Sequence, residues 1–156
     1  MEDVKTQGRL APSYEGDFFA WTQDQGRRLR EVRPNNLDWE NVAEEIESLG
    51  RSEKAELESR LNVLVLHLLK WQFQPGKRKP GWRATILEQR YRIGRRLADS
   101  PSLVKYPGSI LAEEYETARL KAAGETRLSL SRFPEDCPYT VEQILNPNFW
   151  PDLPQG

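Results

Sequence analysis

Hydrophobic residues recur at steps of three and four along most of the chain, and this spacing is typical of amphipathic α-helices. No segment alternates between apolar and polar residues over the length of a β-strand, and no internal repeat is visible. The predicted helices span about residues 13–33, 38–50, 53–72, 82–98 and 109–124, with a short last helix that begins after Thr140.

Residues that cap or interrupt helices set these limits. Ser13 can cap the first helix, and Asn36 or Asp38 can cap the second. Gly50 is expected to end or bend the second helix, because glycine is a poor helix former. Thr140 opens a capping-box pattern, in which a glutamine stands three residues later.

The segment Leu61–Leu69 is apolar on almost every side of its predicted helix. A helix of this kind has to be buried, so it is expected to be the centre of the core. Asn62 and His67 interrupt the apolar run. Buried polar groups need hydrogen-bond partners, so these two residues are expected either to join helices together or to line a pocket.

These patterns predict an all-α fold, a bundle-like domain of about five to six helices around a central apolar helix. The single domain is expected over residues 13–150. A flexible tail of residues 1–12 is expected before it, and a second tail of residues 151–156 after it.

The composition is compatible with a folded, water-soluble chain of 156 residues, with 37% hydrophobic and 30% charged residues and a net charge of −1. The single cysteine, Cys137, cannot form an internal disulfide, which fits a reducing compartment. No apolar run resembles a secretory signal or a membrane span. We therefore expect a cytoplasmic protein with no membrane association.

Charge is unevenly distributed along the chain. Residues 38–58 contain eight acidic and two basic residues, whereas residues 77–96 contain eight basic residues and only one acid, Glu88. The basic segment could contact nucleic-acid phosphates or an acidic protein partner, or it could pair with the acidic segment inside the fold. The candidate residues for binding an anion are Arg83, Arg90, Gln89, Lys70 and Trp82.

Arg60 and His67 are candidates for catalysis because they lie two helical turns apart on one face. This pair resembles the HEPN ribonucleases, all-helical proteins with an arginine, a short spacer and a histidine on one helix. The resemblance implies metal-independent RNA cleavage, in which histidine moves a proton and arginine stabilises the phosphate charge. Leu61 departs from that pattern, since a polar residue is usual next to the arginine. Alternatively, His67 is a hydrogen-bonded core residue and Arg60 pairs with a glutamate one or two turns earlier.

No metal or other cofactor is expected. The chain has one histidine, so it cannot supply the two Glu-x-x-His pairs of a di-metal bundle. The acidic group Glu44, Glu45 and Glu47 is interpreted as a solvated helix face. Gln89, which falls on the apolar stripe of its helix, is expected to be a hydrogen-bond partner of Asn62 or His67.

The stretch from Tyr14 to Trp150 resembles the bacterial family labelled domain of unknown function twenty-nine. The resemblance rests on NVAEEIESLGRSE at residues 41–53, ESRLNVLVLHLLKWQFQP at 58–75, GWRATILEQR at 81–90 and PEDCPYTVEQIL at 134–145. It implies an all-helical fold and no assigned activity. The polar positions of the family pattern are Glu44, Glu45, Arg51, Arg60, His67, Lys70, Gln72, Arg83, Thr85, Gln89 and Arg90.

Three functions remain open from the sequence. The first is a non-catalytic binding module whose basic segment engages nucleic acid or an acidic partner. The second is a ribonuclease-like enzyme of the toxin type that uses Arg60 and His67. The third is a structural protein that assembles through exposed aromatic residues. The sequence does not fix the oligomeric state.

Overall fold

The computed structural model describes residues 10–33 and 35–152, and these contain five α-helices and no strand. The all-α prediction is therefore confirmed. The tails predicted at residues 1–12 and 151–156 lie mostly outside the described residues. The helices are α1 (Phe18–Val32), α2 (Trp39–Phe73), α3 (Pro80–Asp99), α4 (Tyr106–Thr126) and α5 (Val141–Leu145).

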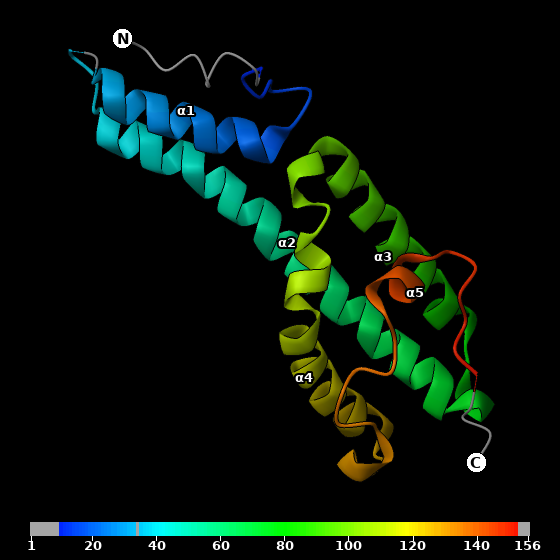
Figure 1. Cartoon of the computed structure of the whole chain (residues 1–156). Coiled ribbons are helices and arrows are strands. Elements are labelled where there is room, and N and C mark those ends of the chain that lie inside the picture. The colour runs from blue at the N-terminus through cyan, green and yellow to red at the C-terminus, as the bar shows by residue number, and fades with distance from the viewer. Residues whose placement is uncertain (1–9, 34, 153–156) are drawn as a thin grey trace.

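Helix α2 is the longest element, with 35 residues, and every other helix packs against it (Figure 1). Its N-terminal part pairs with α1 in an antiparallel hairpin that projects from the rest of the molecule. Its C-terminal half lies between α3 and α4. The apolar run Leu61–Leu69 is in this second half, so the predicted central position of the run is confirmed.

The prediction of two separate helices on either side of Gly50 is wrong, because α2 continues through this glycine without a break. Gly50 is buried where α1 crosses α2. A Cβ atom built there would lie 2.5 Å from Thr22 Oγ1 and 2.8 Å from Gln23 Nε2. Gly26 of α1 is in the same situation, since its Cβ would lie 2.5 Å from Glu47 Oε1. The two glycines let the helix backbones approach closely rather than interrupt a helix.

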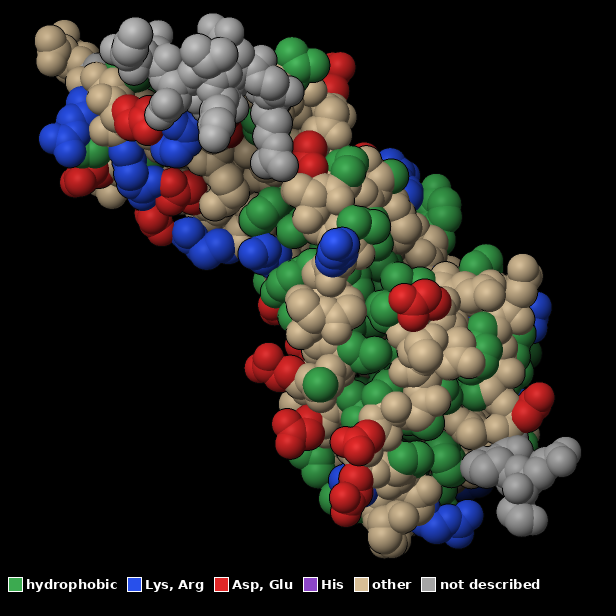
Figure 2. Space-filling view, in the orientation of Figure 1, with side chains coloured by type: hydrophobic (Ala, Val, Ile, Leu, Met, Phe, Trp, Pro, Cys, Tyr) green, Lys and Arg blue, Asp and Glu red, His purple; other side chains and the backbone are tan. Residues whose placement is uncertain are grey.

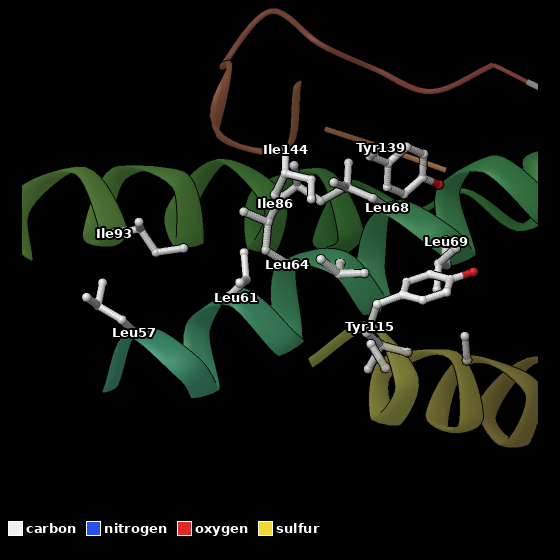
Figure 3. Close-up of a cluster of buried hydrophobic side chains, with 14 of the residues drawn as sticks. Leu57, Leu61, Leu64, Leu68, Leu69, Ile86, Ile93, Tyr115, Tyr139 and Ile144 are labelled. Carbon is white, nitrogen blue, oxygen red and sulfur yellow. The ribbon is translucent and has the colours of Figure 1, made fainter. Parts of the chain in front are cut away.

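The hydrophobic core surrounds the C-terminal half of α2 (Figure 3). Leu57, Leu61, Leu64 and Leu68 of α2 are 0–1% exposed. They face side chains from α3, α4 and the C-terminal segment, which are Ile86, Ile93, Tyr115, Tyr139 and Ile144. Complete burial of such a side chain contributes about 1.5–3 kcal/mol, so this layer is the main source of stability.

The chain after α4 returns across α3 and α4 and is fixed by hydrogen bonds from buried polar side chains. The Tyr139 hydroxyl donates to Gln72 Oε1 at 2.6 Å, and Gln72 Nε2 donates to the carbonyl of Asp152 at 2.8 Å. The capping box predicted at Thr140 opens α5, with both of its hydrogen bonds present. This segment closes the side of the core that α3 and α4 leave uncovered.

Two helix starts differ from the predictions. Asp17, not Ser13, caps α1, and its carboxylate accepts from the backbone N–H of Ala20 at 2.9 Å. The same carboxylate also accepts from Ser102, which ties the start of α1 to the short 3-10 turn that follows α3. Helix α4 begins at Tyr106, three residues before the predicted start at residue 109. No helix in the described part of the chain has the length and hydropathy needed to cross a membrane.

The substitution Gly50→Ala is expected to lower the free energy of unfolding by about 1–2 kcal/mol, because the new methyl group overlaps the buried Thr22 side chain. The matched control is Gly94→Ala on α3, where a Cβ would meet no atom within 4 Å. That control should gain about 0.5–1 kcal/mol from helix propensity. Urea unfolding of both variants measures the difference, and equal stability would contradict the close approach of α1 and α2.

Candidate functional site

The solvent-facing stripe of α2 between α3 and α4 carries the polar residues that the sequence singled out. Arg60, Val63, His67 and Lys70 follow one another at helical spacing, and each is partly exposed. Two shallow hollows of about 450 and 440 Å³ flank the first part of this stripe and share Ser59 and Val63, but His67 and Lys70 line neither of them. The candidate residues of α2 therefore lie along one surface, but they do not enclose a deep pocket.

Arg60 is fixed by contacts on α2 and α3. Its Nη2 atom lies 2.8 Å from Glu56 Oε1, one turn earlier, and its Nη1 atom donates to Gln89 Oε1 at 3.2 Å. The predicted Arg60–Glu56 pair is present. Gln89 is the partner of Arg60, and not of Asn62 or His67 as the sequence suggested. The guanidinium thus joins α2 to α3, and its hydrogen-bonding edge is partly occupied.

His67 lies about 10 Å from Arg60 along the helix axis, because seven residues rise about 1.5 Å each. Its Nδ1 atom lies 2.8 Å from the carbonyl oxygen of Val63. A carbonyl can only accept, so Nδ1 carries the proton and Nε2 is left as an acceptor. Burial lowers the pKa of His67, and the nearby Lys70 lowers it further. The imidazole is therefore neutral at physiological pH.

Lys70 and Trp82, two of the predicted anion-binding residues, are neighbours. The Lys70 ammonium lies 2.8 Å from Glu125 Oε2 on α4 and 4.8 Å from the centre of the Trp82 ring on α3. Lys79 lies 5.8 Å from the same ring. No pattern in the sequence indicates the Glu125 contact, since the two partners are 55 residues apart.

Asn62 is buried, and its side chain makes the hydrogen bonds that a polar group within the apolar run needs. Its side-chain nitrogen donates to Glu114 Oε2 at 2.9 Å and to Thr117 Oγ1 at 2.6 Å. Its side-chain oxygen accepts from Lys121 Nζ at 3.2 Å. All of these partners belong to α4, so Asn62 sets the packing of α2 against α4.

Arg83 and Arg90 lie on the side of α3 that faces Trp150. The Arg83 guanidinium stacks 4.7 Å from the Trp150 ring and remains exposed. Arg90 is 6% exposed, and it donates to the carbonyls of Ile144 and Phe149 at 2.8 Å each. Burial lowers the pKa of Arg90. Its contacts secure the C-terminal segment, which gives it a structural role.

The connection between α2 and α3 forms a basic surface at one end of the molecule, far from the tip of the α1–α2 hairpin (Figure 1). No acidic residue occurs from Ser59 to Leu87, whereas six basic residues do. We define the basic turn as the exposed or partly exposed residues Lys77, Arg78, Lys79, Trp82 and Arg83. None of its four cations makes an ion pair with a described acidic residue.

Tryptophan rings contact three of the four cations of the basic turn, namely Arg78, Lys79 and Arg83. Arg78 donates to the carbonyl of Trp71 at 2.8 Å and lies 4.6 Å from the centre of the Trp71 ring. Trp71 in turn contacts Trp150, with ring centres 4.7 Å apart. Cation–π contacts orient a guanidinium without neutralising it. The positive charge of the turn therefore remains available to a ligand.

At the other end of the basic segment, Arg92 and Arg96 are neutralised within the fold, whereas Arg95 is exposed and makes no ion pair with a described residue. Arg96 of α3 contacts Glu56 Oε2 at 2.7 Å and Glu53 Oε1 at 3.4 Å, and Arg92 pairs with Glu88 at 2.9 Å. Burial raises the pKa of Glu53. The acidic segment of α2 therefore pairs with the C-terminal part of the basic segment only. The N-terminal part of the basic segment has no acidic partner among the described residues.

The acids near the start of α2 are also engaged. Glu44 and Glu47 pair with Arg30 of α1, and Glu44 also pairs with Arg51. Glu44 and Glu45 are exposed, whereas Glu47 is partly buried beside Arg30. No group of three or more residues in the described ranges is arranged to hold a metal ion.

The fold and these contacts define an all-helical protein built on one long central helix. The chain belongs to the family described as "Domain of unknown function DUF29", whose pattern matches residues 13–150. The sequence resemblance is thereby confirmed. The structure is similar to the crystal structure of an alpha-helical protein of unknown function from Rhodospirillum rubrum, with a TM-score of 0.69 and 24% identity over 88% of this chain and 92% of that one. No curated protein matches the chain.

The pKa of His67 predicts a pH dependence of stability. In the folded state, the imidazole of His67 binds a proton less tightly than it does in the unfolded chain, where the histidine pKa is about 6.5. Acidification below about pH 6.5 therefore protonates the unfolded state first and lowers the free energy of unfolding. This loss should be smaller in His67→Gln. Urea unfolding of both proteins between neutral and mildly acidic pH measures it, and parallel pH profiles would contradict burial of the imidazole.

Proposed function

We propose that this protein binds nucleic acid through the basic turn between α2 and α3. The proposal is carried by one observation, namely four cations beside a partly exposed tryptophan with no acidic partner in the described structure. Phosphate contacts supply most of the affinity of such surfaces. Aromatic rings add stacking with unpaired bases, which favours a single-stranded ligand.

The geometry of the turn supports a role for particular residues. Lys77 and Lys79 are exposed and reach solvent on flexible stems. Arg83 is also exposed, and Trp150 supports its guanidinium from one side. Trp82, between Lys70 and Lys79, would provide the stacking face. Of the residues predicted to bind an anion, the proposed interface uses Trp82 and Arg83. It does not use Lys70, Gln89 and Arg90, because they are engaged within the chain.

The double substitution Lys77→Gln/Lys79→Gln should weaken binding to a labelled single-stranded RNA about tenfold at low salt, since two phosphate contacts are lost. The slope of log affinity against log salt should become shallower by about 1.4, which corresponds to about 0.7 for each contact. Fluorescence anisotropy at several salt concentrations measures both quantities.

The matched control for this experiment is Lys105→Gln/Arg127→Gln, which removes two exposed cations outside the basic turn. Its affinity and slope should stay close to those of the wild type. Equal losses in the two double variants would show that binding depends on overall charge and not on the turn. Binding to an acidic protein with no binding to RNA would instead identify the alternative partner class.

A second candidate function is metal-independent RNA cleavage at His67, which is favoured by the free Nε2 atom and the neutral imidazole. A neutral histidine can accept the proton of a ribose 2′-hydroxyl. Arg60 would have to leave Glu56 or use its remaining donors to contact the phosphate. This function needs a rearrangement that nucleic-acid binding at the turn does not need.

If His67 is catalytic, RNA incubated with the protein in EDTA should be cleaved, and His67→Ala should reduce the rate at least about a hundredfold, which is typical for loss of a general base. The variant Arg60→Ala should also be slow, whereas Lys77→Gln should cleave saturating RNA normally. RNA decay at the same rate with wild type and His67→Ala would eliminate this function.

A further inference from the structure

A groove of about 550 Å³ lies between α4 and the C-terminal segment. Its floor is largely apolar and is formed by Leu111, Ala112 and Tyr115 of α4 together with Cys137 and Tyr139. Tyr115 and Tyr139 are buried and belong to the hydrophobic core, so packing fixes the position of these two rings. Figure 2 views this side of the molecule and shows hydrophobic side chains at the surface between acidic ones.

Four exposed carboxylates border the groove on both sides. Glu113 and Glu116 come from α4, and Glu135 and Asp136 come from the C-terminal segment. No described side chain makes an ion pair with any of the four, in contrast to the paired acids of α2. Like charges grouped in this way repel one another, and a cation from outside relieves the cost.

A basic residue of α4 close to the groove is already engaged within the fold. Arg119 follows Tyr115 by one turn, and it donates to the carbonyls of Leu130 and Phe133 at 3.0–3.2 Å. Its guanidinium holds the C-terminal segment and has no carboxylate partner among the described residues. The rim therefore keeps its negative charge around an apolar surface, which fits a ligand that is both cationic and apolar.

We propose that this groove binds a cationic amphipathic segment of a partner protein. One or two apolar side chains of the segment lie on the floor beside Ala112 and Tyr115, and its lysines or arginines pair with the four carboxylates. The volume is within the range of about 300–1,000 Å³ found for ligand pockets. The charge of the groove is opposite to that of the basic turn, so the two sites select opposite classes of partner.

Cys137 provides a reporter for this proposal, because it is the only cysteine of the chain and lines the groove. Burial raises the pKa of its thiol, so alkylation is measured at alkaline pH. The probe is a short synthetic peptide of leucine and lysine at helical spacing. We expect it to slow the alkylation of Cys137, whereas a leucine–glutamate peptide of the same length should not.

Two variants test the contacts. Glu113→Gln/Glu116→Gln should weaken binding of the leucine–lysine peptide about tenfold at low salt, because two ion pairs are lost. Ala112→Arg places a cation of the chain on the floor, and it should abolish the protection of Cys137. The matched control Glu40→Gln/Glu45→Gln removes two exposed acids from α2, and its affinity should be unchanged. Circular dichroism confirms that each variant is folded.

Several outcomes would overturn the proposal. Equal binding of the two peptides, or equal affinity of the groove variant and its control, would show that the peptide does not recognise the groove. Binding without protection of Cys137 would place the peptide elsewhere. Sedimentation of the free protein as a dimer, which Ala112→Arg converts to a monomer, would identify a second copy of the chain as the occupant in place of a different partner.

Discussion

The structure depends on the apolar character of the C-terminal half of α2. This part of the helix carries apolar side chains on almost every side, among them Leu61, Leu64 and Val65, and exposing them to water is unfavourable. Helices α3 and α4 cover two sides, and the segment after α4 has to return to cover the third. Buried hydrogen bonds from Gln72 and Arg90 hold that return segment in place. The grooves and charged surfaces of the molecule are consequences of this wrapping.

Much of the fold could be predicted from the sequence, because helical periodicity and the apolar central run are local properties. The residues at which the helices begin and end were harder to predict. The local pattern at Gly50 predicts an interruption of the helix, but the glycine instead permits close contact with Thr22 of α1. A glycine that ends a helix and a glycine that admits a neighbouring helix look the same in the sequence. Asp17 caps α1 and also reaches Ser102, a contact 85 residues away that no local pattern contains.

The candidate site was predictable in part. The helical positions of Arg60, His67 and Lys70 follow from their spacing, and the structure places them on one stripe. Their partners could not be read from the sequence. Gln89 and Glu125 belong to other helices, and Arg90 binds backbone carbonyls, which every residue carries and no motif marks. Some of the residues predicted to bind an anion therefore hold the fold together, and others are exposed to solvent.

The net charge of −1 conceals a separation of charge that only the folded chain displays. Acids and arginines neutralise one another over short distances within the hairpin and between the middle of α2 and the end of α3. The basic turn and the acidic groove are left uncompensated within the described structure, one at the end of α2 and one beside α4. Unpaired charges of one sign contribute little to folding, since surface ion pairs are weak and like charges repel. Neither surface is therefore accounted for by the stability of the fold, and both proposals start from this point.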